Sequence, residues 1–300
     1  MENLLKSECY DYSTTNKLIR KICENYSAAE CFSIGKSCAG RELLAIKIGK
    51  AQSFSLFAAA FHGSEHITTN ISLLFANELC YALQNDLSIA GMNARKALCG
   101  RGIIIVPRVN PDGCEISIHG AAACGALANK IGRLCKNDFS HWNANLRGVD
   151  INHNFDADWD SLHKLEQKNG IFGPSPTRFG GFAPESEPET MAMCQLCSTY
   201  NIHHATALHS QGEVIYWGYR DICYSRTKQM AQIMSMASGY ALDVPCTLAQ
   251  GGGFKDWFVL QFGRPGFTIE LGKGKNPLPE GEDRKIYLTA REMLMLCAIM

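Results

Sequence analysis

Short apolar runs alternate with amphipathic stretches along the 300-residue chain. Near-continuous apolar runs predict buried strands, whereas apolar residues at every third or fourth position predict helices. Buried strands that alternate with helices are typical of a mostly parallel sheet covered on both faces, so the pattern predicts an α/β fold. Strands are expected at 42–49 and 53–62 (as a paired unit), 101–113 (ending in a Pro/Gly turn), 205–209 and 266–270, and helices at 67–84, 226–240 and 284–300.

Two segments lack a clean period and are expected to be long loops. Residues 120–145 are rich in small and polar side chains, and residues 156–187 contain several prolines and glycines. Long structured loops in a compact domain often carry function. No repeat or low-complexity linker divides the chain, so residues 1–300 are expected to form a single catalytic domain.

Three chemically active side chains fall at the last residue of a predicted strand: His62, His209 and Glu270. In α/β folds, functional sites form just beyond the carboxyl ends of the strands. A catalytic zinc site is made by two histidines and one carboxylate, with the fourth position left for water, and it also needs a separate general base, a role that Glu270 can fill. The residues at the strand ends therefore indicate metal-dependent hydrolysis.

The stretch FHGSEHITTN (61–70) admits two interpretations. In one, His62, Glu65 and His66 form the His-x-x-Glu-His motif of inverted zinc peptidases, with both histidines on one helical face. In the other, His62 and Glu65 are half of a carboxypeptidase-type site that a distant histidine completes. The following helix is predicted to begin near Thr68, after the motif, which favours the second interpretation and leaves His66 a supporting or structural role.

With these residues the sequence resembles the zinc carboxypeptidase family, the metallocarboxypeptidases. The resemblance rests on six segments that occur in the family's order within residues 40–275: His62–Glu65, Asn110–Gly113, Gly148–Phe155, Ala207–Gly212, Gly252–Trp257 and Phe267–Leu271. It implies an α/β fold with a mixed, largely parallel eight-stranded sheet and helices on both faces. It also implies one Zn²⁺ ion, the ligands His62, Glu65 and His209, and Glu270 as the general base.

The sequence departs from that family in its substrate-binding motifs. His153 occupies the position of the arginine that holds a substrate carboxylate, and the two side chains are not equivalent, because a guanidinium offers a fixed charge and a bidentate fork. The region before Gly252 contains Leu248 and lacks the usual tyrosine, and the arginine that stabilises the oxyanion has no clear match, although Arg133 or Arg147 could substitute. Asn152 and His153 remain the candidates for substrate contact.

Three of the segments, Trp142–Asp150, His209–Trp217 and Gly252–Trp257, more specifically resemble the bacterial γ-D-glutamyl-meso-diaminopimelate peptidases. The resemblance implies hydrolysis of the γ-D-glutamyl–diamino acid bond in peptidoglycan stem peptides, with a small peptide or muropeptide as substrate. Two alternatives stay open. One is a metallocarboxypeptidase that trims ordinary peptides and binds their carboxylate with protonated His153; the other is a binding protein that has lost catalysis.

Composition bears on the possible partners and on the cellular compartment. Lys+Arg and Asp+Glu both total 29, so nothing indicates a nucleic-acid or membrane partner. No signal-peptide pattern and no apolar run of about 18 residues is present. With 14 cysteines, these features favour a reducing compartment, by default the cytoplasm. Cys194 and Cys197 are expected in mid-helix as buried, unreactive thiols.

Overall fold

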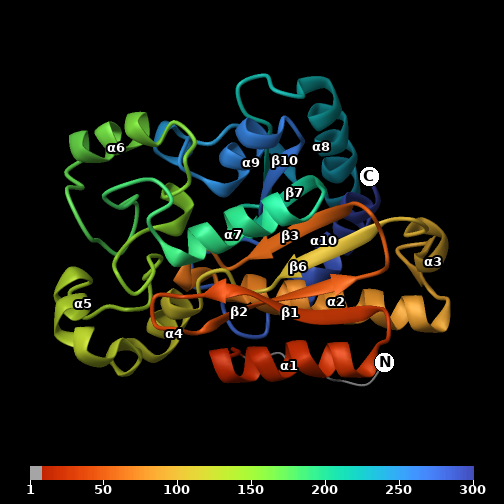
Figure 1. The fold of residues 1–300 in the computed structure, drawn as a ribbon, viewed down its shortest axis with the longest axis horizontal. Helices are drawn as coiled ribbons and strands as arrows, with labels where there is room; N and C mark the ends of the chain where they lie inside the picture. The colour runs from red at the N-terminus through yellow and green to blue at the C-terminus, as the bar shows by residue number, and fades with distance from the viewer. Residues whose placement is uncertain (1–8) are drawn as a thin grey trace.

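The computed structural model describes residues 9–300 and is built around a mixed eight-stranded sheet (Figure 1). The strand order is β1-β2-β6-β3-β7-β10-β8-β9, and the four central strands β6, β3, β7 and β10 are mutually parallel. The predicted sheet is therefore confirmed. The strands are β1 (Ala29–Lys36), β2 (Glu42–Ile48), β3 (Phe54–Ala59), β6 (Gly102–Val106), β7 (Ile202–His209), β8 (Val214–Trp217), β9 (Ala241–Asp243) and β10 (Gly266–Glu270).

Helices cover both faces of this sheet, because the central strands present apolar side chains to both sides. In β6, for example, Ile103 and Ile105 pack on one face and Ile104 packs on the other. In Figure 1, α7 lies on the near side of the strands and α2 and α10 lie on the far side. The first face is covered by α1 (Tyr12–Asn25), α2 (Ile67–Asn85), α8 (Tyr224–Ser238) and α10 (Asp283–Ile299), and the second by α7 (Pro188–Thr199) and α9 (Phe254–Phe262).

The expected helices at 67–84, 226–240 and 284–300 are confirmed as α2, α8 and α10, with shifts of one or two residues at their ends. Helix α2 ends where Asp86 takes a left-handed backbone, and α8 ends at the left-handed Gly239. Left-handed residues of this kind are common helix terminators. No helix among residues 9–300 is long and apolar enough to cross a membrane.

The strand predictions at 42–49 and 53–62 need correction. β2 and β3 are not a paired unit, because β6 lies between them in the sheet. β3 also ends at Ala59, since Ala60 has a left-handed φ of 54° that turns the chain. His62 therefore lies three residues beyond the strand, in the turn that follows it.

Three other predicted segments contain helices that were not expected. The strand at 101–113 stops at Val106, and α4 (Pro111–His119) follows, with Pro111 in its first turn and the Asn110 side chain accepting a bond from Gly113 N–H at 2.8 Å. The segment expected as a loop at 120–145 contains η2 (Gly120–Leu127) and α5 (Ala128–Leu134), and that at 156–187 contains α6 (Trp159–Lys168). Helices α4, α5 and α6 gather at one side of the sheet, at the left of Figure 1.

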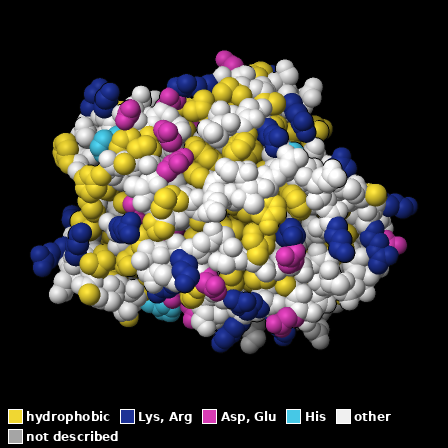
Figure 2. All heavy atoms as spheres, viewed as in Figure 1, with side chains coloured by type: hydrophobic (Ala, Val, Ile, Leu, Met, Phe, Trp, Pro, Cys, Tyr) yellow, Lys and Arg dark blue, Asp and Glu magenta, His cyan; other side chains and the backbone are white. Residues whose placement is uncertain are grey.

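The remaining elements are short and peripheral. β4 (Ser88–Ile89) and β5 (Met92–Asn93) form a separate two-stranded ribbon, followed by α3 (Ala94–Ala97), while η1 (Gly63–Glu65), η3 (Ile151–His153) and η4 (Thr247–Ala249) are single 3₁₀ turns. On the face shown in Figure 2, basic and acidic side chains are interspersed, in keeping with their equal totals of 29.

Candidate metal centre and active-site pocket

The register of two neighbouring strands places His209 beside Glu270. β7 and β10 run parallel, each residue is the last of its strand, and the two are directly paired across the sheet. Because parallel strands end at the same edge, both side chains meet at the carboxyl edge of the sheet. β3 borders β7 on the other side, so the chain that leaves β3 brings His62 to the same edge.

The turn that carries His62 and Glu65 is held tightly by other segments. Gly63 N–H donates to the Asn143 carbonyl at 3.1 Å. A Cβ atom on Gly63 would lie 2.3 Å from the Gly113 carbonyl oxygen and 2.5 Å from that of Trp142. Only glycine fits between these backbone groups, so the spacing between the two functional side chains is fixed by close packing.

Within residues 9–300, His62, Glu65 and His209 offer three potential ligand atoms that all lie within 4.8 Å of one another. His62 Nδ1 is 2.8 Å from Glu65 Oε1, and His209 Nδ1 is 2.9 Å from Glu65 Oε2. Two imidazole nitrogens and a carboxylate form a donor set that suits Zn²⁺. His209 Nε2 is buried and has no hydrogen-bond partner in the described part of the chain.

Asp150 supports this cluster from behind. Its Oδ1 accepts a bond from His62 Nε2 at 3.1 Å, while Oδ2 accepts one from the Arg178 backbone N–H at 2.8 Å. A carboxylate that accepts a hydrogen bond from Nε2–H keeps the proton on that nitrogen, so the Nδ1 lone pair of His62 is free for a metal. The residues present thus fit a zinc ion, with the tautomer of His62 set by Asp150.

His66 lies outside the cluster. It ends the 3₁₀ turn η1 and precedes α2, and its Nδ1 is 3.4 Å from Cys9 Sγ. Burial and the nearby Arg108 lower the pKa of His66 to about 4. His62 and His66 do not share one helical face, so the inverted His-x-x-Glu-His arrangement is not formed.

The pKa values of the two carboxylates of the site are shifted in opposite directions. Burial alone would raise the pKa of Glu65, but the adjacent His62 and His209 outweigh it and lower that pKa to about 2. For Glu270, burial and the negative charge of Glu65 raise the pKa to about 8. A bound divalent cation would oppose this rise, because a positive charge favours the ionised carboxylate. The environment of Glu270 can therefore place its pKa near neutral pH, the range in which a general base works best.

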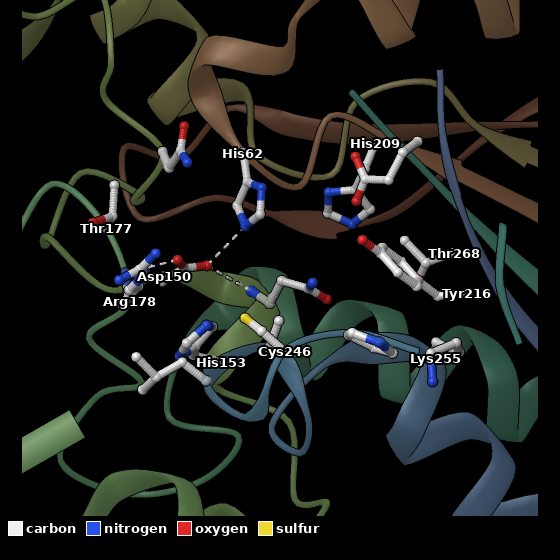
Figure 3. A pocket seen from close by; sticks show the side chains of 16 residues that line it. His62, Asp150, His153, Thr177, Arg178, His209, Tyr216, Cys246, Lys255 and Thr268 are labelled. Carbon is white, nitrogen blue, oxygen red and sulfur yellow. Dashed lines mark hydrogen bonds and ion pairs between the residues drawn. The ribbon is translucent and has the colours of Figure 1, made fainter. Parts of the chain in front are cut away.

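These residues open onto a pocket of about 280 Å³ (Figure 3). Both predicted substrate contacts line it. Asn152 is fixed because its Oδ1 accepts a bond from Phe254 N–H at 3.0 Å, and His153 is fixed because its Nδ1 lies 2.8 Å from the buried Glu166 carboxylate. Leu248 of the 246–250 loop also lines the pocket, and a tyrosine reaches it from a strand, Tyr216 of β8.

The sequence did not predict some of the residues that line the pocket. Asp150 sits inside the Gly148–Phe155 segment, but its bond to His62 could not be read from spacing. Arg178 lies in a segment expected to be functional without a motif of its own, and Lys255 lies within Gly252–Trp257. Neither Arg133 nor Arg147 is among the residues described as lining this pocket.

A second cluster of potential ligands is satisfied by donors of the protein itself. Cys38, Glu187 and Glu189 bring three such atoms within 4.8 Å of one another. Asn145 Nδ2 donates to Glu187 at 2.7 Å and to Glu189 at 3.3 Å, and Arg147 lies 3.5 Å from Glu187. Burial raises the pKa of Glu189 to about 7. We interpret this cluster as a structural network that connects the segment just after β1 with the start of α7.

Cys194 and Cys197 lie in α7, as expected. Cys197 is buried, and Cys194 is half-buried with its Sγ 3.5 Å from Glu185 Oε1. Burial raises the pKa of both thiols, which opposes thiolate formation.

An α/β sheet whose carboxyl edge carries two histidines, a glutamate between them and a further glutamate on the next strand defines a zinc metallopeptidase of the carboxypeptidase type. A family model described as zinc carboxypeptidase matches residues 15–295. The chain belongs to this zinc carboxypeptidase family, whose members use one zinc ion.

Comparison with individual proteins adds detail. The chain is 38% identical over 284 residues to gamma-D-glutamyl-L-diamino acid endopeptidase 1 of Lysinibacillus sphaericus, a match that covers 94% of this chain and 70% of that protein. It is 32% identical over 286 residues to an uncharacterised protein of Bacillus subtilis, covering 94% and 75%.

Solved structures share the fold at lower sequence identity. Bovine thrombin-activatable fibrinolysis inhibitor, in complex with tick carboxypeptidase inhibitor, aligns with a TM-score of 0.77 and 21% identity over 97% of both chains. Murein-tripeptide amidase MpaA of Escherichia coli O157 aligns with a TM-score of 0.55 and 21% identity over 89% of this chain and 91% of that one.

Proposed function

We propose that this chain hydrolyses the γ-D-glutamyl–diamino acid bond of peptidoglycan stem peptides. The observation that supports this choice of substrate is the 38% identity, over 94% of the chain, to a protein named as a γ-D-glutamyl-L-diamino acid endopeptidase. The loss of the arginine at His153 and of the tyrosine near Leu248 supports a substrate other than an ordinary peptide carboxyl terminus.

The proposed catalytic roles follow from the pocket geometry. His62, Glu65 and His209 would hold the zinc ion, and Asp150 would orient His62. When bound, zinc polarises the scissile carbonyl and lowers the pKa of a coordinated water toward about 7. Glu270, paired in register with His209, would accept the water's proton and then donate it to the leaving amine of the diamino acid.

The proposed setting is a reducing compartment, the cytoplasm. All fourteen cysteines are free, including the exposed Cys99 and Cys246. Exposed thiols persist more readily where disulfides are kept reduced. A small muropeptide taken up or released from the wall would be the substrate that such an enzyme meets.

A mass-spectrometric cleavage assay tests the function. Purified zinc-loaded protein is incubated with L-Ala-γ-D-Glu-meso-diaminopimelate, with and without a zinc chelator, beside the Glu270→Gln variant. Zinc-dependent release of L-Ala-D-Glu, lost in the variant, is the expected result. The proposal fails if the zinc form leaves this peptide intact.

Ordinary C-terminal trimming is the second candidate, because cationic side chains do line the pocket. An ordinary peptide with a free carboxyl terminus is therefore assayed in parallel. Removal of its last residue, with the stem peptide left intact, would favour a metallocarboxypeptidase.

A further inference from the structure

Among the described residues, Arg178 is the cation of the pocket whose charge has no carboxylate partner. Its side chain is exposed and lines the pocket, and it takes part in no ion pair with any residue in the range 9–300. The other long cation, Lys255, is buried, donates to the Gly218 carbonyl at 2.7 Å and pairs with Asp256. The positive charge available to a ligand in this pocket is therefore that of Arg178.

The backbone around Arg178 is held in place against the metal centre. Arg178 has a left-handed φ of 66°, which is unfavourable for a residue with a side chain. Its N–H donates to the carboxylate of Asp150, and the Asp150 N–H in turn donates to the Phe179 carbonyl at 2.7 Å. The Pro176 carbonyl accepts bonds from the N–H groups of residues 143 and 144, both at 3.0 Å. Such strain is retained where a loop needs one fixed position, as in a binding site.

The same carboxylate thus positions His62 and Arg178. Asp150 Oδ1 contacts His62 Nε2, and Oδ2 contacts the Arg178 backbone. Figure 3 shows Arg178 and Asp150 on one side of the pocket, with Tyr216 and Thr268 on the opposite side. Thr268 lies on β10, the strand that ends in Glu270. Because Glu270 would donate to the leaving amine, the diamino acid would occupy that side, and the acyl part of the substrate would face Arg178.

We propose that Arg178 binds the free α-carboxylate of the D-glutamyl residue and thereby selects γ-linked substrates; this inference rests on the function proposed above. In a γ-glutamyl bond, the α-carboxylate stays free, separated from the scissile carbonyl by two methylene groups and the α-carbon. An ordinary peptide bond has no carboxylate at this place. A guanidinium suits a carboxylate because it donates two parallel N–H bonds in one plane.

The test compares kcat/KM on three tripeptides: L-Ala-γ-D-Glu-meso-diaminopimelate, the same peptide with the glutamyl α-carboxyl amidated, and the peptide with L-Lys in place of diaminopimelate. Wild-type protein should prefer the free acid over the amide by about ten- to a hundredfold, the range for a charge-assisted contact. In Arg178→Gln this preference should disappear because kcat/KM falls for the free acid and stays unchanged for the amide. Arg178→Lys, which keeps the charge but not the fork, should retain part of it.

Two further variants separate binding from folding. Arg178→Gly relieves the left-handed backbone, so it should melt no lower than wild type and still lose the preference. Arg220→Gln is the matched control, because Arg220 is also exposed, has a left-handed φ of 51° and lies outside the residues that line this pocket. It should keep the wild-type preference.

The outcomes are distinct. If wild type cleaves the stem peptide but Arg178→Gln and Arg178→Gly keep its preference for the free acid, the inference is wrong and the proposed function stands. If the variants instead lose discrimination between diaminopimelate and lysine, Arg178 binds the leaving group and the assignment to the glutamyl side is overturned. If wild type cleaves none of the three peptides, the proposed function itself fails, and the inference fails with it.

Discussion

Asp150→Asn probes how far the metal centre depends on the carboxylate behind His62. Asp150 Oδ1 accepts bonds from His62 Nε2 and from the Asn152 N–H, both at 3.1 Å, and Oδ2 accepts one from the Arg178 N–H at 2.8 Å. An asparagine has one acceptor oxygen. In either orientation its NH₂ group therefore faces an N–H donor, and the two donors repel each other.

The expected magnitude follows from these contacts. Burial alone would raise the pKa of Asp150, but His62 outweighs it and holds that pKa well below its usual range, so the side chain is ionised at neutral pH. Removing a charged partner of a metal-ligating histidine typically weakens metal binding by about 10–100-fold, or roughly 1.4–2.8 kcal/mol. The variant should therefore bind zinc by about one to two orders of magnitude more weakly.

Competition with a chromophoric zinc chelator measures this affinity directly. Asp112→Asn serves as the control, because Asp112 is an equally buried carboxylate that accepts bonds from Ser37 and Arg41 and does not line the pocket. The control is expected to lower the melting temperature without changing zinc affinity. Equal zinc affinity in wild type and Asp150→Asn would refute the supporting role of Asp150.

Three further predictions concern other carboxylates and His66. Glu270→Gln should lower kcat by about 10²–10⁴-fold with zinc content unchanged, since it removes a general base and no ligand; a variant that also loses its zinc would contradict this assignment. His66→Gln should leave zinc affinity unchanged in the chelator assay, because His66 lies outside the ligand cluster, and a large loss would revive the His-x-x-Glu-His interpretation. The pKa of Glu189 rises from 4.5 to about 7 in the buried site, so the folded state holds this proton more tightly than the unfolded state. Its stabilising effect is complete below pH 4.5 and is lost as the pH rises through 7, by at most about 3 kcal/mol. Urea unfolding at pH 5 and pH 8 should show this loss in wild type and not in Glu189→Gln, and parallel behaviour of the two proteins would argue against it.

The sequence predicted the sheet and its helices because buried strands require apolar runs and helices packed on a sheet require an apolar residue at every third or fourth position. It located the ends of β7 and β10 correctly, since His209 and Glu270 each follow an apolar run without a break. It misplaced the end of β3, because the apolar run continues through Phe61 although the backbone turns at Ala60. The left-handed conformation of an alanine leaves no mark in a hydrophobic pattern.

The side-chain contacts of the pocket were harder to predict. Asp150 and Arg178 are brought together by long loops whose helices, α5 and α6, are only 7 and 10 residues long. That His62, Glu65 and His209 form a cluster depends on strand order, which the six family-like segments indicated and the pattern of apolar residues did not. The single-domain organisation of residues 1–300 and the roles of the site residues stay predictions.

The confinement of Gly63 between two carbonyl groups ties the metal centre to the completion of folding. The turn that spaces His62 and Glu65 closes only when the segments around Gly113 and Trp142 have docked against it. His209 arrives from 144 residues beyond Glu65. A fragment ending near residue 100 would carry the His-x-x-Glu sequence without a formed coordination site, and zinc could not template its early folding. Zinc retention therefore reports that the distant parts of the chain have assembled, which makes it a practical assay of native structure for variants outside the metal ligands and Asp150.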